Sequence, residues 1–181
     1  MSHRVVVTGG PGAGKTALLT ALEARGYPYV PETARAVIQE RLRRGLSPRP
    51  APEEFAREIL RVDLERYRDA PPDGGWCFFD RGILDALGML DQLGLLTAAE
   101  TDEYVRRYPY VPTVFMLPPW REIYRMDEER DQTFEESVRV HDELTRWYLR
   151  CGYALAEVPR ASVADRCGFV LNELVRRAWN P

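Results

Sequence analysis

The sequence predicts a three-layer α/β domain, in which a five-stranded parallel sheet lies between two layers of helices. Short apolar segments alternate along the chain with segments whose apolar residues recur at helical spacing. Residues 76–80 are almost continuously apolar, as expected for a parallel strand that is buried on both faces. A glycine-rich segment at 9–16 joins the first strand to the first helix. These three observations predict one α/β domain over residues 1–181.

The strands are the apolar segments, and turn residues or polar side chains mark their ends. The first contains three consecutive valines, the second is closed by Pro31, and Asp80 ends the third. Pro112 must lie near the start of the fourth strand, because proline cannot donate a hydrogen bond to a sheet. We expect the five strands at residues 4–8, 27–30, 76–80, 111–117 and 153–158.

The helices are marked by their apolar periodicity and by residues that start or stop them. Glycines follow three of them, at Gly26, Gly45 and Gly152. Thr-x-x-Glu capping boxes start two others, at 97–100 and 133–136, and Pro52 suits a first helical position. We expect helices at residues 17–25, 32–44, 52–69, 81–93, 97–107 and 133–150, with a last helix capped by Ser162 and a short charged helix after Trp120.

Composition excludes several classes of protein. The net charge is −3 and no basic stripe is present, which argues against a nucleic-acid partner. No apolar segment approaches membrane-spanning length, and the first residues lack a signal region, so we expect a cytoplasmic protein. The three cysteines lack metal-ligand spacing, and with two histidines a histidine-based metal site is not expected.

The glycine-rich segment carries the strongest functional signal. Residues 9–16 read GGPGAGKT and match the phosphate-binding pattern G-x-x-x-x-G-K-[ST] at every fixed position. Glycines let backbone N–H groups turn inward around a polyphosphate, Lys15 can reach the β- and γ-phosphates, and Thr16 can ligate Mg²⁺. Lys15 is also the only lysine among 25 basic residues. We therefore expect ATP and Mg²⁺ as cofactors, held by Gly10, Pro11, Gly12, Ala13, Gly14, Lys15, Thr16 and Ala17. Residues 9–16 are called the P-loop below.

A second set of polar residues should meet the P-loop, since ligands of parallel sheets bind at the carboxyl ends of the strands. Asp80 ends the third strand, where it can position Mg²⁺ or, alternatively, cap the next helix. Arg81 follows it and can neutralise charge on a transferred phosphoryl group, or be an ordinary surface arginine. Glu32 and Arg35 stand one helical turn apart after the second strand. They can serve an acceptor hydroxyl, or be an exposed pair favoured by the helix dipole.

The segment after the fourth strand is rich in charge. It contains Arg121, Arg125 and Arg130 among several acidic residues. One interpretation is a solvated helix with salt bridges. The other is a lid over about residues 119–132, whose arginines close on the phosphates and exclude water.

Several of these motifs resemble the bacterial AAA-type ATPase family that is grouped with the ribosylnicotinamide kinase domain of NadR. The resemblance rests on the P-loop, Pro31-Glu32-x-x-Arg35, Phe79-Asp80-Arg81-Gly82, the segment 118–124 and Val158-Pro159. It covers nearly the whole chain and extends to P-loop nucleoside and nucleotide kinases. It implies a P-loop NTPase fold, an Asp-Arg pair after the third strand and a lid after the fourth. It also implies a base-like glutamate at Glu32 and a nucleobase beside Pro159.

We therefore expect a Mg-ATP-dependent kinase that phosphorylates a nucleoside, nucleotide or related hydroxyl compound. The acceptor would lie between Glu32-Arg35 and Asp80-Arg81-Asp85, with either Glu32 or Asp80 as the base. The alternative is a nucleotide-binding regulatory module with slow or no turnover. A remodelling motor would need an additional helical domain, and a guanine-reading Asn-Lys-x-Asp motif cannot occur with Lys15 as the only lysine. The choice of ATP over GTP, and of monomer or homodimer, stays open.

Overall fold

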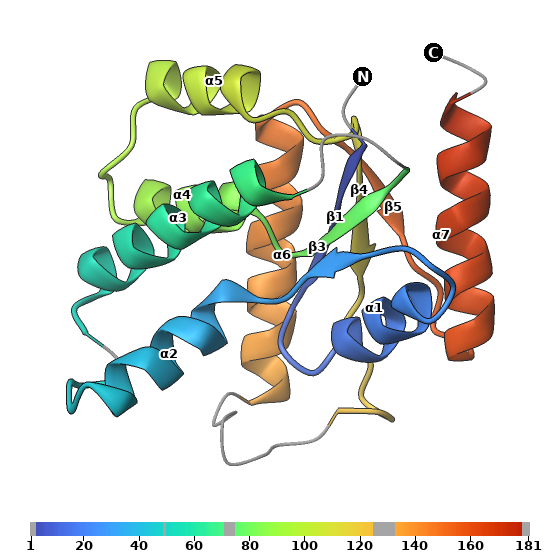
Figure 1. Cartoon of the computed structure of the whole chain (residues 1–181), viewed down its shortest axis with the longest axis horizontal. Helices are drawn as coiled ribbons and strands as arrows, with labels where there is room; N and C mark the ends of the chain where they lie inside the picture. Colours follow the sequence, from blue (N-terminus) through green and yellow to red (C-terminus); the bar gives the residue numbers. More distant parts are fainter. Residues whose placement is uncertain (1–2, 49, 71–74, 125–132, 179–181) are drawn as a thin grey trace.

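The structure, a computed structural model, describes residues 3–48, 50–70, 75–124 and 133–178, and shows a parallel sheet between two layers of helices (Figure 1). The strand order is β2-β3-β1-β4-β5, and every neighbouring pair is parallel. The strands are β1 (Arg4–Gly9), β2 (Tyr29–Val30), β3 (Cys77–Asp80), β4 (Thr113–Leu117) and β5 (Ala154–Glu157). The predicted fold class and the five parallel strands are therefore confirmed.

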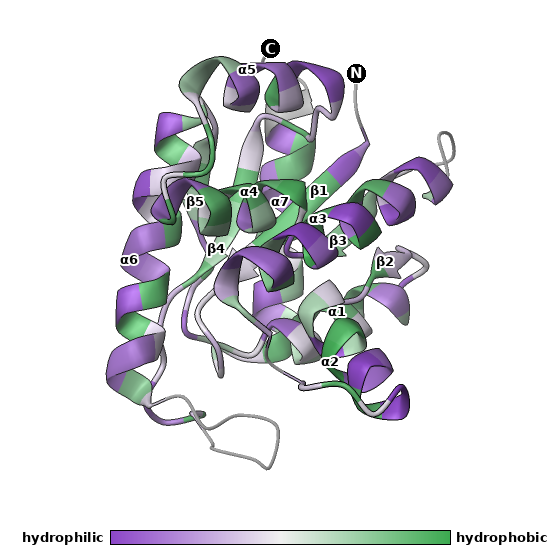
Figure 2. Cartoon of the chain, turned by 90° about the vertical axis from the view of Figure 1, so that its left-hand side faces the viewer, coloured by the Kyte–Doolittle hydropathy of each residue, from purple (hydrophilic) through white to green (hydrophobic). Residues whose placement is uncertain are grey.

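Seven helices cover the two faces in the part of the chain that the structure describes. They are α1 (Lys15–Glu23), α2 (Thr33–Arg43), α3 (Pro52–Asp69), α4 (Ile83–Gln92), α5 (Ala98–Arg107), α6 (Phe134–Arg150) and α7 (Val163–Ala178). Helices α1 and α7 pack on one face, whereas α3, α4 and α6 pack on the other. Figure 2 shows hydrophobic strands between helices that carry hydrophilic residues on their outer surfaces.

The alternation of β1 explains why the chain needs both layers. Val5 and Val7 point into the cluster with α1 and α7, and Val6 points into the cluster on the opposite face. All three valines are fully buried. Burying such a side chain stabilises the fold by about 1.5–3 kcal/mol, so both faces of β1 contribute to stability.

Element boundaries differ locally from the expected ones. Helix α1 begins at Lys15, so the lysine and Thr16 belong to its first turn. Helix α4 begins at Ile83, because Gly82 is extended and Arg81 has a left-handed backbone with φ 67°. The expected short helix after Trp120 is a turn over residues 121–123, and the rest of that segment lies outside the described residues.

The register of the sheet places the strand ends at one rim. Val7 of β1 pairs with Asp80 of β3, and Gly9 pairs with Leu117 of β4. The P-loop, Asp80 and the segment after β4 therefore start close together, as the sequence predicts. Among the described residues, no helix has the length and apolar character needed to cross a membrane.

Candidate nucleotide and acceptor site

The P-loop is held tightly at its glycines. Gly12 and Gly14 have φ values of 74° and 82°, a region that residues with a Cβ rarely adopt. A Cβ on Gly10 would lie 2.4 Å from the backbone oxygen of Ser137, and one on Gly12 would lie 2.5 Å from the ring of Tyr124. The Ser137 hydroxyl donates a 2.7 Å hydrogen bond to the oxygen of Pro11. Helix α6 therefore braces the loop from outside.

Lys15 folds back over the loop. Its Nζ donates to the carbonyl oxygens of Gly9 at 3.2 Å and Gly10 at 3.1 Å, and the side chain is buried. Burial lowers the pKa of Lys15, and the nearby Arg81 guanidinium lowers it further against the pull of Asp80 and Glu32. Thr16 and Ala17, the next two residues, are exposed at the start of α1. The loop thus presents a cation and free helical N–H groups to an anion.

A cavity of about 440 Å³ opens beside the P-loop. It is lined by Gly12, Gly14, Lys15, Thr16, Ala17, Trp120, Ile123, Ala161, Ser162, Val163 and Arg166. Trp120 follows β4, and residues 161–163 follow β5, so the cavity spans the rim where a nucleotide would extend from the loop. Trp120 and Arg166 were not singled out from the sequence. The sequence marks them only as a tryptophan in a charged segment and as an arginine amid the apolar residues of α7.

Four other residues expected near the nucleotide are placed differently or lie outside the described part. Arg121 is exposed, pairs with Glu135 at 2.9 Å and lies over the ring of Phe134, so it does not line the cavity. Pro159 is exposed and does not line it either. Arg125 and Arg130 lie outside the described residues, as does the lid segment beyond Tyr124.

Asp80 fits a role near Mg²⁺. Its Oδ1 is buried and has no hydrogen-bond partner among the described residues, and burial raises the pKa of Asp80 even though Lys15 opposes the shift. An unpartnered buried carboxylate oxygen is suited to a cation or its water shell. The described residues hold no cluster of three His, Cys, Asp or Glu that could bind a metal alone. The residues therefore fit Mg²⁺ bound through Thr16, Asp80 and phosphate oxygens.

Arg81, which follows β3, links the start of α2 to the first turn of α4. Its Nε donates to Glu32 at 3.0 Å, its Nη1 donates to Asp85 at 3.1 Å, and its backbone N–H donates to Val7 at 2.9 Å. Burial lowers the pKa of Arg81, but Glu32, Asp85 and Asp80 outweigh that effect and raise it. The guanidinium is therefore permanently charged, in a left-handed backbone conformation that the three contacts stabilise.

Asp85 is the buried anchor of this arrangement. Oδ1 accepts from the hydroxyl of Thr8 at 2.7 Å and from Arg81, and Oδ2 accepts from the Gly82 N–H at 3.0 Å and from Tyr148 at 2.5 Å. These four donors come from the end of β1, from the turn before α4 and from α6. Asp85 was expected to contact an acceptor, but the structure engages both of its oxygens with internal donors.

Of the two carboxylates that pair with Arg81, Glu32 is the one that remains partly exposed to solvent. Its side chain is 30% exposed and immediately precedes α2. Burial raises the pKa of Glu32, but Arg81 and Lys15 outweigh that effect and lower it below its ordinary value. Arg35, one turn later, contributes in the same direction and is half-buried. Glu32 is thus ionised at neutral pH.

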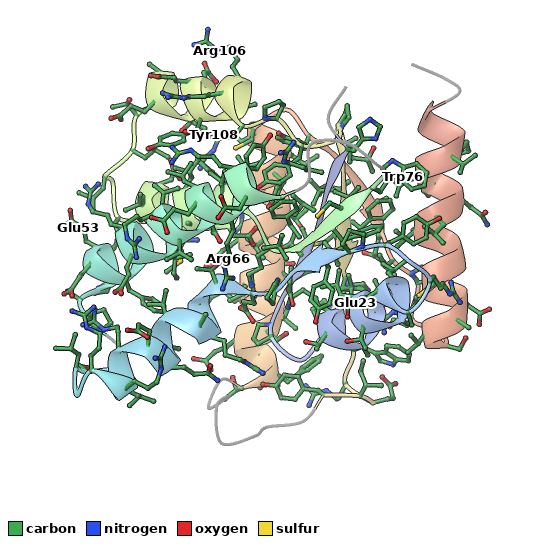
Figure 3. All side chains as sticks on the ribbon, viewed as in Figure 1. Glu23, Glu53, Arg66, Trp76, Arg106 and Tyr108 are labelled. Atoms are coloured by element: carbon green, nitrogen blue, oxygen red, sulfur yellow. The ribbon has the colours of Figure 1, made fainter. Side chains whose placement is uncertain are left out.

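A fourth carboxylate, which no sequence motif marked, lies next to this group. Asp63 of α3 accepts a hydrogen bond from Thr33, whose hydroxyl also accepts from Arg66 at 3.0 Å. Figure 3 shows Arg66 between α3 and the start of α2. The Arg66 guanidinium also donates to the carbonyl oxygen of Pro31 at 2.7 Å. Burial raises the pKa of Asp63 to about 7. The available signal was a carboxylate spaced four residues after the buried Ile59 and four before the buried Tyr67.

Comparisons with known proteins identify the family of the chain. A family model described as an AAA domain matches residues 4–166. No curated protein matches the chain.

Three solved structures share the fold. The deoxyadenosine kinase of M. mycoides with products dCMP and dCDP bound is 16% identical, with a TM-score of 0.65, over 96% of this chain and 99% of that one. The NadR protein in complex with NR is 18% identical, with a TM-score of 0.66, over 96% of this chain and 50% of that one. Shikimate kinase from Acinetobacter baumannii with shikimate is 13% identical, with a TM-score of 0.57, over 96% and 93%.

Proposed function

The chain belongs to the AAA domain family, and we propose that it is a Mg-ATP-dependent phosphotransferase. It would transfer the γ-phosphoryl group to a hydroxyl of a nucleoside, nucleotide or related small molecule. The observation that carries the proposal is the Glu32–Arg81–Asp85 network beside the P-loop. None of these three residues lines the cavity beside the loop, so they lie outside the space that the nucleoside end of ATP would take. The structural neighbours, a deoxyadenosine kinase, a shikimate kinase and NadR in complex with NR, support the same assignment.

The residues divide the reaction between them. Lys15 would leave its carbonyl partners to neutralise the β- and γ-phosphates, and Thr16 and Asp80 would hold Mg²⁺, which supplies further neutralising charge. The acceptor oxygen attacks the γ-phosphorus, the bond to the β-phosphate oxygen breaks, and ADP leaves. Glu32 or Asp80 takes the hydroxyl proton, and Arg81 stabilises charge on the transferred group. Arg35 would hold the acceptor, and Asp85 would keep Arg81 in position.

We propose further that the protein acts in the cytoplasm, as a monomer or homodimer, and that it has no nucleic-acid partner. Arg125 and Arg130 would belong to the lid, and Arg121 and Pro159 would join the nucleotide when the lid closes.

The test is ADP formation from ATP and Mg²⁺ in the presence of a panel of nucleosides, nucleotides and other hydroxyl compounds. We expect at least one acceptor to raise ADP formation above the hydrolysis background, and Glu32→Gln to abolish that increase. Glu40→Gln is the matched control, because Glu40 lies on the adjoining α2 and pairs with the exposed Arg43. ATP binding with no acceptor that stimulates turnover would instead indicate a nucleotide-binding module.

A further inference from the structure

Arg166 of α7 is a buried cation beside the P-loop. It is 3% exposed, and its Nη2 donates a 2.9 Å hydrogen bond to the carbonyl oxygen of Gly14. A Cβ on Gly14 would lie 3.0 Å from Nη1, so the guanidinium lies directly against the end of the loop. Arg166 also lines the cavity that Trp120 and Val163 border.

The charge of Arg166 is not neutralised by any carboxylate among the residues that the structure describes. The contrast is with Arg41, which is also buried but forms ion pairs with Glu54 at 2.9 Å and Glu58 at 2.8 Å. Burial lowers the pKa of Arg166, and the Cys167 thiol beside it opposes the shift only weakly. A buried cation with a single carbonyl partner is costly, and an anionic ligand would remove that cost.

The two buried cations of the site lie at opposite ends of the loop. Lys15 Nζ contacts the carbonyls of Gly9 and Gly10, whereas Arg166 contacts the carbonyl of Gly14. In a P-loop, the lysine binds the β- and γ-phosphates and the backbone cradles the α- and β-phosphates. The Arg166 end of the loop is therefore the α-phosphate end.

The rest of the cavity suits a nucleoside next to that phosphate. Trp120, Ile123, Ala161 and Val163 give it apolar walls, and its volume is about 440 Å³. An aromatic face is suited to stack on a base. Arg166 and these apolar side chains thus line the same cavity beside the P-loop.

We propose that Arg166 binds the α-phosphate of the donor nucleotide, so that the site distinguishes a nucleotide from a shorter phosphate ligand. The proposal rests on the ATP-dependent function above. It assigns Arg166 a ligand in addition to Gly14, and it makes the end of the loop a specific contact for the nucleotide.

The experiment compares the affinities of ATP and of pyrophosphate, whose two phosphates fill the β- and γ-positions only. We expect Arg166→Gln to weaken ATP binding by about 10- to 100-fold, the usual cost of losing a hydrogen bond to a charged group. Pyrophosphate affinity should change by less than about twofold, and ADP should follow ATP. Arg176→Gln is the matched control, because Arg176 is an exposed arginine of the same helix that pairs with Glu173.

Two results would overturn the proposal. Equal weakening of ATP and pyrophosphate would show that Arg166 only braces Gly14, and unchanged affinity for both would show that it contacts no phosphate. If Arg166→Gln does not fold, Arg166→Lys serves instead, and we expect it to lose an intermediate amount of ATP affinity and no pyrophosphate affinity. These are binding measurements, so they stay decisive when no acceptor is found, and a missing acceptor challenges only the proposed function.

Discussion

Asp85 and Tyr148, 63 residues apart in the chain, are joined by a 2.5 Å hydrogen bond from the tyrosine hydroxyl to the carboxylate. The contact ties the first turn of α4 to the last turns of α6, and it leaves the other carboxylate oxygen to Thr8 and Arg81. Tyr148 is fully buried. The position of Arg81 therefore depends on packing far from the P-loop in sequence.

Asp85→Asn should destabilise the fold, because each carboxylate oxygen accepts from two donors, and two of the four donors would then face the amide NH₂ group. We expect the free energy of unfolding to fall by about 1–3 kcal/mol in urea titrations. Asp91 lies on α4 like Asp85, is partly exposed and pairs with Arg150 of α6. Asp91→Asn should therefore lower the free energy of unfolding by less than about 1 kcal/mol. A smaller loss for Asp85→Asn than for Asp91→Asn would contradict the anchoring role.

Asp80→Asn should have the opposite effect on stability. Burial raises the pKa of Asp80, so its ionised form costs folding free energy that the neutral amide would not. We expect a higher melting temperature at pH 7 without ligand, together with an approximately 10- to 100-fold rise in the Mg²⁺ concentration needed for tight ATP binding. A variant with normal Mg²⁺ dependence would show that Asp80 acts only in the protein framework.

Lys15→Met should remove ATP affinity without damaging the fold. The ammonium is buried against two carbonyl oxygens, and burial lowers its pKa, so a methionine of similar length relieves that cost. We expect the melting temperature to hold or rise and ATP affinity to fall at least about 10- to 100-fold in calorimetric titration. Unchanged affinity in a folded variant would exclude a phosphate role for the loop.

The pH dependence of turnover can distinguish Glu32 from Asp80 as the base. A general base must be deprotonated, so activity falls as the pH drops through its pKa. Arg81 and Lys15 hold the pKa of Glu32 below its ordinary value, whereas burial raises that of Asp80.

If Glu32 is the base, kcat/KM should stay level as the pH falls to about the ordinary glutamate value, and Glu32→Gln should cost about 10²–10⁴ in kcat. A fall at higher pH that Glu32→Gln leaves in place would assign the base to Asp80.

Asp63→Asn should change how stability depends on pH. Asp63 stays protonated in the fold up to about pH 7, whereas in the unfolded chain it ionises near 3.8. The folded state therefore binds the extra proton between these values, and the stability of the parent falls as the pH rises from about 4 to 7.

The asparagine keeps an acceptor for Thr33 but carries no charge beside Glu32 and Asp85. We expect it to match the parent near pH 4 and to exceed it above pH 7 in thermal unfolding. The same difference between the two proteins at both pH values would contradict the raised pKa.

The sequence predicts the sheet, the P-loop and the rim because each depends on local patterns. Apolar segments identify the strands, and parallel strands bring their carboxyl ends together, so Asp80 could be placed beside the loop. The role of Asp85 could not be predicted, since it depends on Tyr148 and Thr8, which only the packing of α6 against β1 brings near. Arg166 looks like any other arginine until α7 packs against α1 and places its guanidinium on Gly14.

Lys15 carries the only side-chain amine of the chain. It is the only lysine side chain in the sequence, so an amine-selective reagent can modify the protein there or at the amino terminus and nowhere else. Because burial lowers its pKa, a larger fraction of this amine is uncharged and nucleophilic at a given pH than for an exposed lysine. Covalent labelling of this one site would report directly how much of the loop is open to solvent. A nucleotide with a reactive phosphate ester would become attached at a position known in advance.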